Sequence, residues 1–135
     1  MIAQEVAEQE FDRFAEAMDI ETDVTQMTEE TEEMFTASRN KFIKAIVKGK
    51  LVVNENGEPV YTPVRSSNTS PITFKEPDGA ALITNSRGRK KADDGVGQMY
   101  QIMGSMTGTG AGRFANMKLV ESQDCMAIAS LFIAQ

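Results

Sequence analysis

The sequence predicts an α+β fold that is mainly α, with four or five helices, a β-hairpin and one additional short strand. Three observations predict it: amphipathic spacing of apolar residues over most of the chain, a change to strand-like runs after residue 49, and an Asn-Gly turn between two of those runs. The chain has 135 residues, of which 41% are hydrophobic and 25% are charged. This length and composition suit one soluble domain with a modest core, or a small domain with an appendage.

The first two predicted helices span residues 4–18 and 29–48. Their apolar residues recur every three or four positions, which gives each helix one apolar stripe. Thr28 is a candidate N-cap for the second helix, and Gly49 is placed to end it. The apolar positions are Ala7, Phe11, Phe14, Ala15 and Met18 in the first helix and Phe35, Phe42, Ile43 and Ile46 in the second.

A β-hairpin follows, with strands expected at residues 51–53 and 60–62. With a two-residue loop, Val53 would pair with Val60. Pro59 has no N–H to donate to a neighbouring strand, so we expect the second strand to lie at the edge of the sheet.

The rest of the chain alternates loops, one strand and further helices. Ser122 is the expected N-cap of the last helix, which is apolar nearly all round in its C-terminal part. The expected elements are a strand at 72–75, a short helical segment at 78–83, an exposed loop at 85–95, a helix at 95–107, a glycine-rich connector at 108–112 and a helix at 120–134.

Charge is divided unevenly along the chain. Residues 1–36 contain twelve acids and one base, a net charge of −11, whereas residues 37–135 contain eight acids and thirteen bases, a net charge of +5. We therefore divide the chain into an acidic helical arm, residues 1–50, and a body of hairpin and helices, residues 51–135. The arm can fold back on the body, support self-association by binding a neighbouring copy, or bind a basic partner. A solvated acidic helix face is the alternative.

The composition argues against an enzyme. The chain has no His, and the single Cys125 lacks a disulfide partner, so the usual serine, cysteine and zinc hydrolase sites and a disulfide scaffold are excluded. The glycines at 108, 110 and 112 follow a helix rather than a strand, which argues against a phosphate-binding loop. We predict no catalytic residue, metal ligand or cofactor, and we interpret the acids at 29–33 as a solvated helix start.

No membrane or secretory segment is predicted. Residues 1–5 lack the basic and apolar regions of a signal peptide. The longest nearly apolar run, residues 125–134, is about half the ~20 residues that a membrane-spanning helix needs.

A basic cluster, Arg87, Arg89, Lys90 and Lys91, is the one feature that suggests nucleic acid. The cluster has no interleaved aromatic residues and the chain is acidic overall. We interpret it as a solvated loop or as the counterpart of the acidic arm, and we do not predict nucleic-acid binding.

Nine methionines are a further signal, since their flexible thioethers fill irregular gaps in cores and adapt to varied partners. Both uses remain open for four of them in the second half of the chain. These are Met99, Met103, Met106 and Met117.

Residues 61–135 carry several short motifs in a defined order. An alternating strand runs through Glu76-Pro77 into a small-residue helix, a later helix ends at Thr107-Gly108, and Leu119 precedes a helix with an early Asp124. In this order and spacing, over about sixty residues, the chain resembles the tail assembly chaperones of long-tailed bacteriophages. The acidic arm lies outside the resemblance.

The resemblance implies a non-enzymatic helper in the host cytoplasm that binds the tape measure protein and tail tube protein during tail assembly. An apolar, aggregation-prone client needs an adaptable apolar surface. The expected partner-binding residues are Leu82, Met99, Met103, Met106, Phe114, Leu119, Met126 and Phe132. The alternative is a structural virion protein, such as a neck, baseplate or capsid-decorating subunit.

Overall fold

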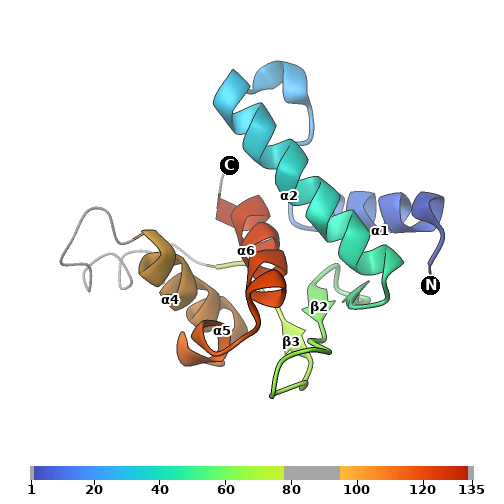
Figure 1. The fold of residues 1–135 in the computed structure, drawn as a ribbon. Helices are drawn as coiled ribbons and strands as arrows, with labels where there is room; N and C mark the ends of the chain where they lie inside the picture. Colours follow the sequence, from blue (N-terminus) through green and yellow to red (C-terminus); the bar gives the residue numbers. More distant parts are fainter. Residues whose placement is uncertain (1, 78–94, 134–135) are drawn as a thin grey trace.

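A small antiparallel sheet lies beside a group of helices in the computed structural model, which describes residues 2–77 and 95–133 (Figure 1). The sheet order is β1-β2-β3. The prediction of a mainly α, α+β fold is confirmed. The described elements are α1 (Gln4–Ala17), the 3₁₀-helix η1 (Val24–Gln26), α2 (Glu29–Val47), β1 (Leu51–Val53), β2 (Pro59–Tyr61), β3 (Ile72–Thr73), α4 (Gly95–Thr107), α5 (Gly112–Ala115) and α6 (Leu119–Ile133).

Helices α1 and α2 pack through aromatic rings. Four residues of the predicted α1 stripe are buried and Met18 is partly buried. The Phe11 and Phe42 rings pack edge to face at a centroid distance of 5.3 Å. Phe14 stacks on Phe42 at 4.7 Å and meets Phe132 of α6 at 5.3 Å. The contact with Phe132 joins the acidic arm to the body of the same chain.

The predicted ends of α2 are confirmed. Thr28 Oγ1 accepts a hydrogen bond from Thr31 N at 3.2 Å, as an N-cap does. At the other end, Gly49 adopts a left-handed φ of 80°, which lets the N–H of Lys50 reach the carbonyl of Ala45 at 3.0 Å.

The hairpin differs from the prediction in its register. Val52 pairs with Val60, and Val53 pairs with Pro59, so the expected pairing of Val53 with Val60 is wrong by one position. The cause is Asn54, whose side-chain Oδ1 accepts hydrogen bonds from Asn56 N at 3.0 Å and from Glu58 N at 2.9 Å. This Asx-type bonding organises a longer loop in place of a two-residue turn.

Strand β2 is the central strand, so the expected edge position is also wrong. Pro59 is tolerated there because it is the first residue of the strand, where a missing N–H disturbs the ladder least. Its carbonyl oxygen still accepts a hydrogen bond from Phe74 N at 2.9 Å, beyond the last paired residue of β3.

The second half of the chain matches the prediction for α4 and departs from it further on. The glycine-rich connector leads into a short helix, α5, that was not predicted. Helix α6 begins at Leu119, and Ser122 lies inside it, buried, with its Oγ donating to the Leu119 carbonyl at 3.0 Å; the expected N-cap at Ser122 is therefore wrong. The helical segment predicted at 78–83 and the loop residues 85–94 lie outside the described residues.

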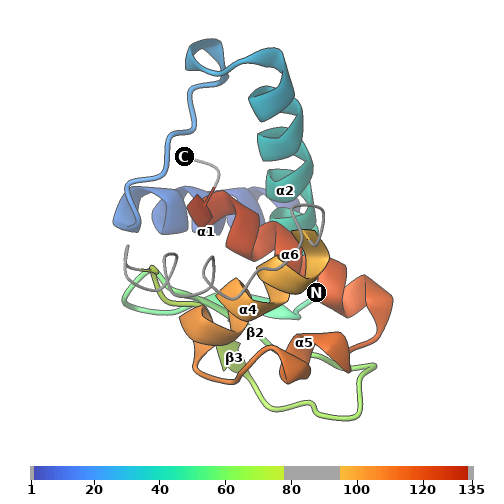
Figure 2. The ribbon, with the colours of Figure 1, turned by 90° about the vertical axis from the view of Figure 1, so that its left-hand side faces the viewer.

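One continuous hydrophobic core crosses the division at residue 50. It contains Phe11 and Phe42 from the arm together with Tyr61, Met103 and Ile128 from the body. Helix α2 packs on α6, and α1 packs on β1. Figure 2 shows η1 and the first turns of α2 at the end of the molecule farthest from β3 and α5.

Candidate functional site

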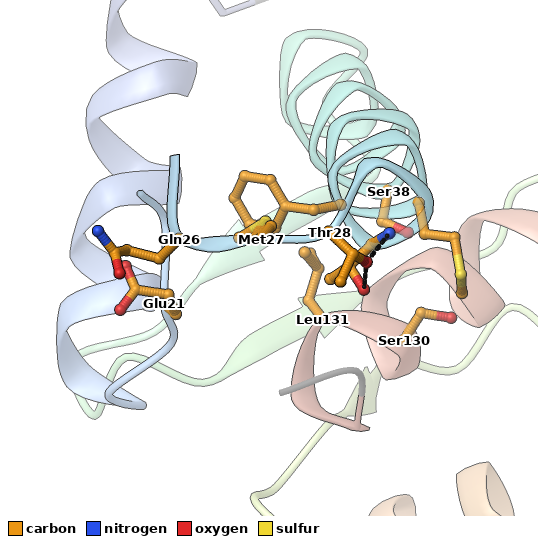
Figure 3. A pocket seen from close by; sticks show the side chains of 10 residues that line it. Glu21, Gln26, Met27, Thr28, Ser38, Ser130 and Leu131 are labelled. Atoms are coloured by element: carbon orange, nitrogen blue, oxygen red, sulfur yellow. Dashed lines mark hydrogen bonds between the residues drawn. The ribbon is translucent and has the colours of Figure 1, made fainter. Parts of the chain in front are cut away.

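A hollow of about 290 Å³ opens between α2, the end of α6 and the segment that connects α1 to α2 (Figure 3). We name it the methionine hollow because Met27 and Met34 line it from two different elements. Leu131 of α6 and Met27 are directed toward the same space in Figure 3. The apolar lining consists of Met27, Met34, Phe35 and Leu131, and the polar lining consists of Glu21, Gln26, Thr28, Thr31, Ser38 and Ser130.

The connecting segment is held in place by local hydrogen bonds at both ends. Helix α1 ends where Asp19 takes a left-handed φ of 53° and the N–H of Ile20 donates to the carbonyl of Ala15 at 2.8 Å. Asp23 then caps η1, since its Oδ1 accepts from Thr25 Oγ1 at 2.6 Å and from Thr25 N at 3.0 Å. These two bonds, the side-chain bond first, lower the pKa of Asp23 below its usual value.

The floor and rim of the methionine hollow differ in character. Phe35 and Leu131 are buried, whereas the Met34 side chain at the rim is 57% exposed. Two hydroxyls of the lining bond to each other, since Thr28 Oγ1 donates to Thr31 Oγ1 at 2.9 Å (Figure 3). Ser130 Oγ likewise donates to the Met126 carbonyl at 2.8 Å, so these three polar side chains of the lining already bond within the protein. The four apolar side chains, two of them flexible methionines, offer a surface that suits an apolar side chain of a partner.

Glu121 is the one fully buried carboxylate among the described residues. Its oxygens accept hydrogen bonds from Ser66 Oγ at 2.6 Å, Val64 N at 2.7 Å and Arg65 N at 3.1 Å, and Lys50 Nζ lies 3.2 Å away. Burial by itself raises the pKa of Glu121, but these donors outweigh it and lower the pKa to about 2. A carboxylate so fully engaged holds structure together and does not transfer protons near neutral pH.

Two other buried titratable groups have the same structural character. Burial raises the pKa of the Cys125 thiol, which therefore stays protonated, and its Sγ lies 4.0 Å from Met117 Sδ. Burial likewise raises the pKa of Tyr61, whose hydroxyl donates to Asp124 Oδ2 at 2.8 Å.

The residues predicted to bind a partner are distributed between core and surface. Met103 and Met106 of α4 and Phe114 of α5 are buried, so these three side chains belong to the protein's own core. Leu119 is 68% exposed at the start of α6, and Leu82 lies outside the described residues. The remaining three are partly buried and pack against the core; they are Met99, Met126 and Phe132.

The residues of the methionine hollow were not predicted as a binding surface from the sequence. Phe35 was expected only as a core residue, and Met34 was given no role. The available signal was Met34 itself, an apolar side chain among four glutamates at a helix start. The glutamates at 29, 30, 32 and 33 are exposed, as expected of a solvated helix start.

In residues 2–77 and 95–133, no group of three His, Cys, Asp or Glu side chains is arranged to hold a metal ion. The helices in the same ranges are too short or too polar to cross a bilayer. The basic cluster at 87–91 lies outside the described residues.

Comparison with known proteins gives no match. No protein family matches the chain, and neither a curated protein nor a solved structure does.

Proposed function

We propose that this chain is a tail assembly chaperone of a long-tailed bacteriophage, which binds the tape measure protein and the tail tube protein during tail morphogenesis. The motif order in residues 61–135 supports the family. The proposal implies a non-enzymatic role in the host cytoplasm, exerted through protein binding alone.

The methionine hollow is the observation that carries the binding role. A chaperone must hold apolar side chains that differ from one client segment to the next. Met27 and Met34 can change rotamers to fit such side chains, while the buried Phe35 and Leu131 give the hollow a fixed floor.

A structural virion protein is the second candidate, and a second apolar surface favours it. Val64, Leu119 and Val120 are 60%, 68% and 50% exposed. The N–H of Val64 donates a hydrogen bond to Glu121 Oε2 at 2.7 Å, and this bond brings the loop after β2 to the first turn of α6. The methionine hollow uses the other end of α6, so two apolar surfaces could serve two neighbouring subunits in a particle.

Two measurements on the full chain separate the candidates. A chaperone should raise the soluble fraction of the tape measure protein when the two are co-expressed, and immunoblotting should find it in infected cells but not in purified particles. Its presence in particles at a fixed ratio to the tube protein would instead establish the structural role. No change in tape measure solubility would contradict the chaperone proposal.

A further inference from the structure

The methionine hollow lies in the most acidic part of the chain. Between Arg13 and Arg39 there is no Lys or Arg. Eight acids lie in that interval, namely Glu16, Asp19, Glu21, Asp23, Glu29, Glu30, Glu32 and Glu33. Four of these acids lie in the first turns of α2, and Figures 1 and 2 show that these turns and η1 project from the rest of the molecule.

One of these acids lines the hollow, and another lies one helical turn from Met34. Glu21 is part of the lining of the hollow. Glu30 is exposed and precedes Met34 by four residues, one turn along the same side of α2. An apolar side chain that enters the hollow therefore brings its flanking residues next to carboxylates.

The helix dipole does not reverse this charge. The N-terminus of α2 contributes roughly half a positive charge. The negative charge of the three glutamates in its first turn is larger than this; they are Glu29, Glu30 and Glu32. The potential around the hollow is thus negative, and a partner with acidic flanks would be repelled.

The walls of the hollow also indicate the partner's backbone conformation. They come from α2, α6 and the connecting segment, and none of them is a strand of the sheet. An extended peptide would find no strand to pair with, whereas a helix satisfies its own backbone hydrogen bonds and offers side chains on one face.

We propose that the methionine hollow binds an apolar side chain from a Lys/Arg-rich amphipathic helix of a partner protein. The inference rests on the proposed function, because it gives the chemistry of the client segment that a chaperone would hold. The apolar face of that helix contacts Met27, Met34 and Phe35, and its basic residues face Glu21 and Glu30. A second copy of the chain is the competing occupant.

Two synthetic peptides test the charge requirement. Both have about 18 residues, or roughly five helical turns, and the same Leu and Phe stripe, but one has lysines on its polar face and the other has glutamates. The full-length chain should bind the lysine peptide at least about tenfold more tightly in fluorescence anisotropy, and this preference should shrink as salt screens the charges. Equal binding of both peptides would overturn the inference.

Matched variants test the position. Met34→Ser should weaken lysine-peptide binding by about tenfold, and the control Val6→Ser, at an exposed apolar position of α1, should not. Glu30→Lys in the first turn of α2 should weaken binding by about fivefold, whereas Glu5→Lys, in the first turn of α1, should have little effect. Loss of binding in the controls to the same extent would show general attraction to an acidic protein and overturn the proposal.

The remaining outcomes separate this inference from the proposed function. If the lysine peptide fails to bind but the chain still solubilises the tape measure protein, the inference fails and the proposed function stands. If the peptide binds at Met34 but the tape measure protein is unaffected, the proposed function fails. If Met34→Ser changes self-association in sedimentation without changing peptide binding, the occupant is a second copy and the inference fails.

Discussion

Lys50 Nζ lies 3.2 Å from Oε2 of the fully buried Glu121, and this ion pair joins the end of the acidic arm to the first turn of α6. The same carboxylate accepts hydrogen bonds from the N–H of Val64 and from Ser66 Oγ, in the loop that follows β2. Three segments far apart in the sequence therefore meet at one side chain, and the arm and body are fixed to each other by it.

Replacing this carboxylate should destabilise the protein. Glu121→Gln keeps the size of the side chain but replaces one carboxylate oxygen with an NH₂ group, which cannot accept the hydrogen bonds that the oxygen accepts now. The charge of Lys50 would also lose its partner. We expect the free energy of unfolding to fall by about 3 kcal/mol, measured by urea denaturation with circular dichroism. Glu5→Gln, at an exposed position, is the control, and a change below about 1 kcal/mol in the Glu121 variant would contradict this role.

The stabilisation from Glu121 should also depend on pH. Its folded-state pKa of about 2 lies below the ordinary value of 4.5, so its contribution is complete above about pH 4.5 and is lost as the pH falls toward 2. That difference corresponds to about 3 kcal/mol. The gap in unfolding free energy between wild type and Glu121→Gln should be constant near neutral pH and should close between pH 4.5 and 2. A gap that stays constant to pH 2 would assign the effect of the variant to lost packing instead.

Arg13 should hold the hairpin loop to α1. Its two Nη atoms donate to the carbonyls of Asn54 at 2.7 Å and Val53 at 2.6 Å, and its Nε donates to Glu10 at 2.8 Å. The single ammonium of Arg13→Lys cannot reproduce this fork, so we expect a loss of about 1 kcal/mol and faster amide hydrogen exchange in residues 54–58. The control is Arg65→Lys, and unchanged exchange in the loop would contradict the prediction.

Helices α1, α2 and α4 could be predicted because their signals are local. The apolar stripe of α1, the Thr28 cap and Gly49 each act within a few residues, and all three are present in the structure as expected. The hairpin was predicted on the same basis, but its register was not, because the side chain of Asn54 bonds to the loop in a way that competes with the Asn-Gly turn.

Features that depend on distant contacts were not predicted. Glu121 is an ordinary helix residue in the sequence, and its burial requires donors from the loop after β2 and from Lys50. Met103 and Met106 could serve a core or a partner, and only the packing of α4 against α6 places them in the core. The methionine hollow likewise forms where α6 meets α2, two helices with separate local signals.

A side chain at position 104 should destabilise the protein, because the backbone after α4 packs directly against Gly104. A Cβ at this position would lie 2.5 Å from the Gly110 carbonyl carbon and 2.6 Å from Ala111 N, and backbone atoms cannot move aside as a flexible side chain can. The N–H of Gly110 also donates to the Gly104 carbonyl at 3.3 Å. We expect Gly104→Ala to reduce the unfolding free energy by about 2 kcal/mol through overpacking, although alanine is the better helix former.

The control is Gly112→Ala, where a Cβ would have no heavy atom within 4 Å, and this variant should unfold at the wild-type temperature or slightly above it. Equal melting temperatures for the two variants would mean that the turn after α4 can open without loss of stability.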